Sequence, residues 1–246
     1  MRLYTLGTSH GATEPGRGCS GNLLEVNGSY YLFDCGGNVE GKMTDLHLPV
    51  TDIRAAFISH MHEDHIGGLS AIAKRFATYR QESGNPVSMF LPEEQGIDAF
   101  SRWLEAMHFP KTEDAFTLHL VREGSVYRDE NVSVTAIPTR HMENGKYPSF
   151  AYMICSGQEK MLYTGDLNSD FGDYPQILSE EEFDAVLSEL VHFSFEKNLE
   201  TIVKTKTKKL IFTHMAPDNI PKVAEHKDAF PFEVCIAEDG ACFLID

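Results

Sequence analysis

The segment from His60 to Gly68 constrains this chain more than any other part of its sequence. Three histidines and one aspartate, residue types that bind metals, lie within six positions of this segment. They are His60, His62, Asp64 and His65. The apolar residues before it (53–59) predict a strand, and the residues from Ile66 onward predict a helix. Imidazole nitrogens and carboxylate oxygens on a loop at the end of a strand are typical of a transition-metal site that holds zinc, manganese or iron.

Length and composition favour one ordered domain. The chain has 246 residues, 42% of them hydrophobic, which is enough for a single domain (1–246) with a substantial core. The formal net charge is −16. Such an acidic chain lacks the basic surface that a long nucleic acid requires, although a small anion can still approach a local metal centre.

The cysteines and the hydropathy of the chain predict where in the cell the protein is located. The five cysteines are scattered, odd in number and without metal-binding spacing, which favours a reduced, cytoplasmic protein. There is no run of about 18 apolar residues, so we expect no membrane partner. Residues 2–7 resemble a strand, so we expect no secretion signal.

Hydrophobic periodicity predicts alternating strands and helices in both halves. In the first half we expect strands at 3–6, 22–26, 30–34, 53–58 and 88–91, a helix over 66–79 and a second helix from Pro92. Asn27-Gly28 predicts a hairpin turn. In the second half we expect strands at 132–137, 150–154, 161–164, 185–187 and 210–213, and a helix over 195–206.

The C-terminus reads as a hairpin of two strands (234–237 and 242–245) that turn at Asp239-Gly240. Together these patterns predict an α/β fold in which two mixed sheets pack face to face with helices outside. The polar ends of several strands would then meet at one edge of the sandwich.

Three more residues of ligand type stand where predicted strands end. They are His141, Asp166 and His214. With the four residues of the 60–65 loop they make seven candidate ligands, the number that a bridged pair of metal ions would use.

The whole pattern resembles the metallo-β-lactamase superfamily, whose fold is an αβ/βα sandwich. His60 to His65 match its His-x-His-x-Asp-His motif, and residues 6–8 with 32–36 are similar to its first motif. Residues 148–152, Pro-Ser-Phe-Ala-Tyr, resemble the ribonuclease Z-like branch of phosphodiesterases in particular.

The resemblance implies roles for these residues. It implies two divalent metal ions per chain, zinc first, with manganese or iron as alternatives. His60, His62 and His141 would bind one ion, Asp64, His65 and His214 the other, and Asp166 would bridge them. Asp34 would support the loop without binding metal. A hydroxide shared by the two ions would attack the substrate, and Asp64 would orient it or accept its proton.

The sequence also departs from ribonuclease Z. That family has a long basic arm that grips transfer RNA, whereas here only a short turn at Gly157 joins the strands at 150–154 and 161–164. We therefore predict a small or cyclic phosphodiester as substrate and no binding of transfer RNA. Two alternative functions stay open: hydrolysis of a lactone, carboxylic ester or thioester, and a non-catalytic metal-binding scaffold. The oligomeric state also stays open, and a homodimer is possible.

Two further histidines are candidates for the site. His192 follows an apolar strand and could protonate a leaving group, or could be a partly buried histidine bonded to a carbonyl group. His10 lies in a glycine-rich loop that could line the site. The lysines at 204, 206, 208 and 209 are the only compact basic group, and we interpret them as a solvated helix end.

Overall fold

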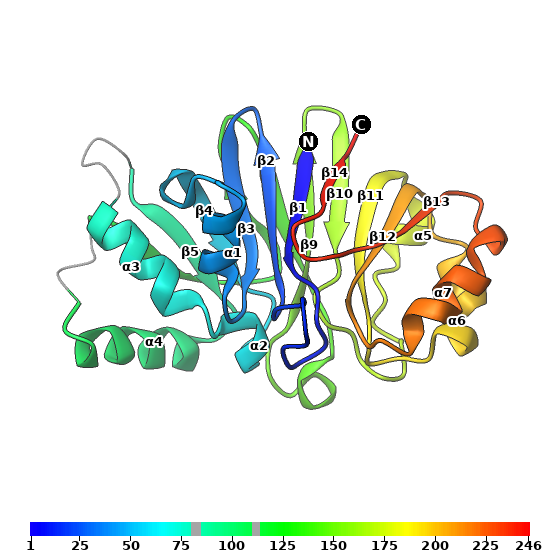
Figure 1. Cartoon of the computed structure of the whole chain (residues 1–246), viewed down its shortest axis with the longest axis horizontal. Coiled ribbons are helices and arrows are strands. Elements are labelled where there is room, and N and C mark those ends of the chain that lie inside the picture. Colours follow the sequence, from blue (N-terminus) through cyan, green and yellow to red (C-terminus); the bar gives the residue numbers. More distant parts are fainter. Residues whose placement is uncertain (80–84, 110–113) are drawn as a thin grey trace.

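Two seven-stranded sheets form the centre of the molecule (Figure 1). The computed structural model describes residues 1–79, 85–109 and 114–246. Within these residues the first sheet has the order β14 (Cys242–Leu244), β1 (Arg2–Gly7), β2 (Gly21–Val26), β3 (Ser29–Cys35), β4 (Ile53–Phe57), β5 (Val87–Leu91) and β6 (Phe116–Leu120). The strands from β14 to β3 pair antiparallel, and those from β3 to β6 pair parallel.

The second sheet has the same division into antiparallel and parallel halves. Its order is β13 (Glu233–Ile236), β12 (Thr207–Met215), β11 (Phe183–Leu190), β10 (Glu159–Tyr163), β9 (Phe150–Ser156), β8 (Ser133–Pro138) and β7 (Gly124–Arg128). The strands from β7 to β10 are antiparallel, and those from β10 to β13 are parallel. Both sheets are therefore mixed, as the sequence predicts.

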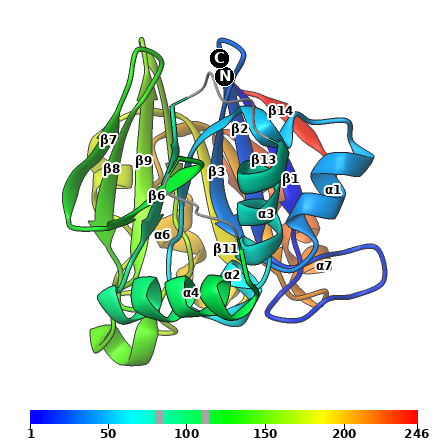
Figure 2. The ribbon, with the colours of Figure 1, turned by 90° about the vertical axis from the view of Figure 1, so that its left-hand side faces the viewer.

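Helices cover the outer faces of the two sheets (Figure 1). Beside the first sheet lie α1 (Val39–Asp45), α3 (Leu69–Tyr79) and α4 (Glu94–Ala106), and Figure 2 shows α3 and α4 in front of its strands. Beside the second sheet lie α5 (Ile177–Glu180), α6 (Phe195–Ile202) and α7 (Asn219–Glu225). The short helix α2 (Glu63–Ile66) lies at the lower edge of the first sheet. This layering confirms the predicted αβ/βα sandwich. No helix of the described chain is long and apolar enough to cross a membrane.

Aromatic side chains fill the space between the sheets. Phe57 of β4 is fully buried, and its ring stacks on Phe33 and on Phe90 with centroid separations of 5.1 Å in each case. Across the sandwich, the ring of Tyr152 lies 5.7 Å from that of Phe57. Two further apolar clusters lie under the outer helices, so each sheet is buried on both faces. This burial explains why many strands read as continuous apolar runs rather than as alternating ones.

The predicted C-terminal hairpin is wrong. β13 pairs with β12 in the second sheet, whereas β14 pairs with β1 in the first. The chain crosses between the sheets at the Asp239-Gly240 turn, where the Gly240 amide donates to the Thr5 carbonyl at 2.6 Å. Ala237 and Ile245 are buried in the core between the sheets, so the crossing closes one side of the sandwich. The turn was therefore identified correctly, but not the partners of its two strands.

Other differences are local. The helix predicted over 66–79 starts only at Leu69, after Gly67-Gly68, which separate it from α2. The helix predicted over 195–206 ends at Ile202, and β12 starts at Thr207. The sequence did not predict the strands β6 and β7 or the short helices α1, α5 and α7. β6 and β7 are partly exposed edge strands, and β6 (Phe-Thr-Leu-His-Leu) alternates apolar and polar residues, a strand pattern that the prediction from sequence overlooked. The assignment of residues 1–246 to one domain stays a prediction.

Truncation of Phe57 tests how much the aromatic core stabilises the sandwich. We expect Phe57→Ala to lower the free energy of unfolding by about 3–5 kcal/mol, because it removes a buried ring and leaves a cavity. Leu244→Ala is the control, since Leu244 is 59% exposed and should change that free energy little. Urea unfolding of both variants measures the difference, and equal effects would contradict this view of the core.

Candidate metal centre

The loop between β4 and α3 carries four of the seven candidate ligands. It starts directly after the buried strand β4, and α2 places Asp64 and His65 on its buried side. The loop packs closely against the end of β3, where a Cβ atom at Gly36 would lie 2.1 Å from the carbonyl oxygen of Asp64. A Cβ atom at Gly68 would lie 2.3 Å from the Gly36 carbonyl oxygen. Both positions therefore need glycine for this loop to reach its place.

Asp34, at the end of β3, holds the loop from below. Its side chain is fully buried. Its Oδ1 accepts a hydrogen bond from the Ser59 amide at 2.7 Å, and its Oδ2 accepts from Ser59 Oγ at 2.8 Å, from His65 Nδ1 at 2.8 Å and from Tyr163 Oη at 2.6 Å. Among the donors of these four hydrogen bonds, His65 is the only candidate ligand. It thus has the supporting position that the resemblance implied.

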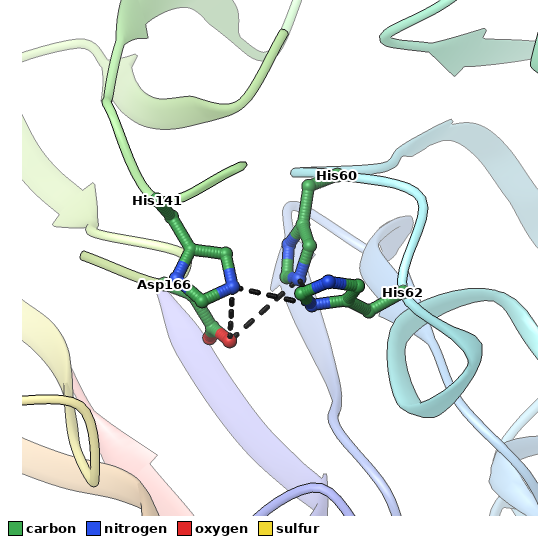
Figure 3. A group of neighbouring side chains, drawn as sticks. All are labelled: His60, His62, His141 and Asp166. Carbon is green, nitrogen blue, oxygen red and sulfur yellow. Dashed lines mark hydrogen bonds and ion pairs between the residues drawn. The ribbon is translucent and has the colours of Figure 1, made fainter. Parts of the chain in front are cut away.

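One group of candidate ligands joins both sheets (Figure 3). It consists of His60, His62, His141 and Asp166, whose ligand atoms all lie within 4.8 Å of one another. His62 Nδ1 lies 3.0 Å from His60 Nε2 and 3.2 Å from His141 Nε2. Three nitrogen atoms from two sheets thus face a common point, and Asp166 supplies an oxygen beside them.

A second group lies next to the first. It consists of Asp64, His65 and His214, again within 4.8 Å of one another. Asp64 Oδ2 lies 3.3 Å from His65 Nε2 and 3.7 Å from His214 Nε2. All three side chains are buried.

Asp166 stands between the two groups. Its Oδ2 is 3.6 Å from His60 Nε2, 3.4 Å from His65 Nε2 and 3.3 Å from His214 Nε2. Asp166 Oδ1 and His65 Nε2 are buried and have no hydrogen-bond partner in the structure. Buried polar atoms without partners are rare in proteins. These atoms, in a site made of imidazoles and carboxylates, therefore fit divalent cations well.

In four of the five histidine rings of the two groups the protein fixes Nδ1, whereas His62 turns its own Nδ1 toward the site. His60 Nδ1 lies 3.0 Å from Ser59 Oγ, His141 Nδ1 donates to the Leu167 carbonyl at 3.2 Å and His214 Nδ1 donates to the Ser9 carbonyl at 2.7 Å. With the His65–Asp34 bond, these contacts leave each Nε2 free to face the site. Such partners orient histidine ligands in metal sites.

The protonation of His60 and Asp166 suits cation binding, whereas at His65 and His214 the Asp166 carboxylate outweighs burial and raises the pKa. Burial lowers the pKa of His60 well below its ordinary value, and the neighbouring His65 lowers it further. Burial alone would raise the pKa of Asp166, but the surrounding histidines, first His214 and then His65 and His60, hold it well below its ordinary value. The structure therefore presents a neutral imidazole and an ionised carboxylate at this point.

His192 lies at the rim of the site. Its ring centroid is 4.4 Å from that of His141, and its Nδ1 is 3.7 Å from Asp166 Oδ2. Nδ1 also donates to Glu189 Oε1 at 2.8 Å. Burial would lower the pKa of His192, but the hydrogen bond and charge of Glu189 outweigh it and raise the pKa to about 9. His192 is thus near the candidate ligands and bonded to a carboxylate, not to a carbonyl group.

His10 has a different position. Its Nδ1 lies 3.4 Å from Glu14 Oε1 within the loop that follows β1, and its side chain is 34% exposed. Among the residues that the structure describes, neither group of candidate ligands contains His10. A role for His10 in substrate contact stays a prediction.

Glu189 is a functional residue that the sequence reasoning missed. It is only 1% exposed, and its carboxylate accepts hydrogen bonds from the Leu167, Val191 and His192 amides as well as from the His192 ring. It thereby supports His192 directly and the Leu167 carbonyl that holds His141. The available signal was a carboxylate shortly after the apolar residues 185–187 of β11, where a buried polar group needs several hydrogen-bond donors.

Comparisons with known proteins agree with this geometry. The family model described as "Anti-Pycsar protein Apyc1" matches residues 1–233. Ribonuclease Z of Picosynechococcus sp. is 30% identical over 156 residues, which cover 63% of this chain and 47% of that protein. The match thus spans about half the length of that curated relative.

Solved structures share the fold over its full extent. Human tRNase Z, short form, superposes with a TM-score of 0.79 at 22% identity and covers 100% of both chains. A diphosphatase from the PhnP family reaches 0.75 at 17% identity and covers 100% of this chain and 98% of its own. The match of the family model shows that the chain belongs to the Anti-Pycsar protein Apyc1 family, and the solved structures share its fold.

Proposed function

We propose that this protein is a dinuclear metal-dependent phosphodiesterase that acts on a small or cyclic phosphodiester. The observation that supports this most is the position of Asp166 Oδ2, which lies 3.3–3.7 Å from His60, His65, His141 and His214. A ligand that bridges two ions must lie close to both groups of residues, and this single carboxylate oxygen has such a position. The seven residues come from one chain, so one copy supplies a complete set whether the protein acts as a monomer or as a homodimer.

In this proposal His60, His62 and His141 hold one ion, Asp64, His65 and His214 hold the other, and Asp166 contacts both. When bound, two divalent cations, zinc first, lower the pKa of an attacking water and neutralise charge on the phosphoryl oxygens. Asp64 is 7% exposed and borders the space between the groups. It would orient the water or accept its proton.

His192 would protonate the leaving oxygen. Its Nδ1 is engaged by Glu189, which leaves Nε2 as the nitrogen that can meet a substrate. The side chain is 31% exposed, whereas His60, His65 and His214 are buried, so a substrate can reach it from solvent. His192 also belongs to a third close group, with Asp166 and His214. We assign it to proton transfer because the other seven residues already make up the two groups of candidate ligands without it.

Two observations support a small substrate over transfer RNA. β9 and β10 pair from Ser156↔Glu159 onward, so their connection is a tight turn at Gly157 without any arm. The basic residues near β12 are also neutralised locally, since Lys208 lies 2.8 Å from Asp184 and Lys209 lies 3.4 Å from Glu233. With a net charge of −16, this leaves little positive surface for a polyanion.

The proposed compartment is the cytoplasm. All five cysteines are free of disulfide bonds in the structure, in agreement with a reducing environment.

The first prediction concerns the bridge. Asp166→Ala should reduce the metal content from two equivalents per chain to less than one, because both ions lose a ligand. Elemental analysis of protein purified without chelator measures this, and Asp45→Ala, which alters an exposed carboxylate, is the control. Two retained equivalents in Asp166→Ala would contradict a bridging role.

The second prediction concerns His192. His192→Ala should lower kcat by about 10²–10⁴ for a phosphodiester with an alkoxide leaving group, because that group needs a proton. With a p-nitrophenolate leaving group the loss should be much smaller, and the metal content should stay at two. Steady-state rates on both substrates test this. An equal loss on both, accompanied by loss of metal, would mean that His192 is a ligand.

The third prediction concerns RNA. A titration with precursor transfer RNA at physiological salt should show weak or undetectable binding, while bis(p-nitrophenyl) phosphate is hydrolysed. Repetition at low salt separates a weak electrostatic contact from a specific one. Submicromolar binding followed by a single cut at the 3′ trailer would overturn the substrate assignment.

A further inference from the structure

The loop between β1 and β2 contributes to the metal centre without supplying a ligand. This loop (8–20) carries Ser9, whose carbonyl oxygen accepts the hydrogen bond from His214 Nδ1 at 2.7 Å. Ser9 is itself fully buried. The orientation of the His214 ring therefore depends on where the loop places a single backbone carbonyl group.

Arg17 fastens this loop to the strand that carries His214. Its Nη2 donates to the carbonyl oxygen of Met215 at 2.8 Å and also to that of Thr8. Its Nε donates to Thr8 Oγ1 at 3.1 Å, and its Nη1 donates to Glu14 Oε2 at 2.8 Å. The guanidinium thus uses all three nitrogens, and two of its acceptors flank the Ser9–His214 bond.

These contacts lie on both sides of the ligand. Thr8 precedes Ser9, and Met215 follows His214, so the Arg17 Nη2 group joins the residue before the acceptor to the residue after the donor. The Met215 amide also donates to the Thr8 carbonyl at 3.2 Å. His214 has a φ of 43°, in the left-handed region that residues other than glycine rarely adopt. A backbone in this region needs such support from its surroundings.

Asp239 completes the attachment of the loop. Its Oδ1 accepts from Thr8 Oγ1 at 2.8 Å, and its Oδ2 accepts from the Gly18 amide at 2.6 Å. The crossing between β13 and β14 therefore holds the loop near its two ends, at Thr8 and Gly18, and Arg17 ties the same two ends to Met215 of β12.

We propose that Arg17 is a positioning residue for His214, which it keeps aimed at the second group of candidate ligands by fixing the Ser9 carbonyl. This inference rests on the metal site of the proposed function. Lysine cannot replace Arg17 in this role, because an ammonium group lacks the planar fork that reaches Thr8 and Met215 together. The effect should be confined to the ion proposed for Asp64, His65 and His214. None of the hydrogen bonds described above joins the 8–20 loop to a ligand of the other ion.

The first test measures metal affinity. In a titration with a chelator, Arg17→Lys should lose one metal equivalent at a chelator concentration about 10–100-fold lower than the wild type, and should lose the other equivalent unchanged. Arg2→Lys, the same substitution at an exposed arginine bonded to Glu25, should behave as the wild type. In a His214→Ala background, Arg17→Lys should cause no further loss, because its effect passes through that ring.

The second test needs no metal. In chelated wild-type protein, NMR spectroscopy should show a slowly exchanging Nδ1 proton for His214, protected by Ser9. In Arg17→Lys this proton should exchange at least about 10-fold faster, whereas in Arg2→Lys it should not. Unchanged proton exchange in Arg17→Lys would overturn the role of Arg17, whatever the metal content. A wild-type protein that binds no metal would instead refute the proposed function.

Discussion

The arrangement of the site depends on one buried carboxylate, that of Asp34. Its four donors come from the loop after β4, from α2 and from β10, which belongs to the other sheet. The same side chain therefore fixes the start of the metal loop, orients His65 and links the two sheets at their common edge. A buried carboxylate is tolerated only when its hydrogen-bonding capacity is filled. The position of the loop and the packing of the sheets are thus coupled through Asp34.

Electrostatics explain why the site fits cations. Asp34, Asp64, Asp166 and Glu189 are all nearly inaccessible to solvent, and the molecule as a whole carries a charge of −16. The protein compensates Asp34 and Glu189 with hydrogen bonds from its own backbone and side chains. Asp166 instead keeps one buried oxygen without a hydrogen bond, and the nearby His65 Nε2, although close to two carboxylate oxygens, neither accepts nor donates a hydrogen bond. The protein thus leaves polar groups unpaired at the point where the proposed ions would bind.

Much of the candidate site could be predicted from the sequence, because its candidate ligands follow strand ends and because four of them lie within six positions. The support around them could not. Glu189 gave only a weak signal within an apolar strand, and Arg17 acts through the carbonyl groups of Thr8 and Met215, which any residue types would provide. Contacts to backbone atoms leave no pattern in the sequence.

The fold, like the site, has features that the sequence predicted and features that it did not. Buried strands and the sandwich were predictable from apolar runs, whereas the edge strands β6 and β7 were missed, although β6 alternates apolar and polar residues. The C-terminal strands show a second limit. Asp239-Gly240 correctly marks a turn, but a local signal cannot tell a hairpin from a crossing between sheets. Here the choice depends on distant partners, because Thr5 in β1 binds the turn and Ile245 completes the core.

The central claim is that two metal ions bind side by side around Asp166. Anomalous diffraction from crystals of the metal-loaded protein, collected on both sides of the absorption edge of the metal, tests it most directly. The account predicts two anomalous peaks about 3.5–4 Å apart, one beside His60, His62 and His141 and the other beside Asp64, His65 and His214, with Asp166 between them. A single peak, or peaks that do not share Asp166, would contradict it.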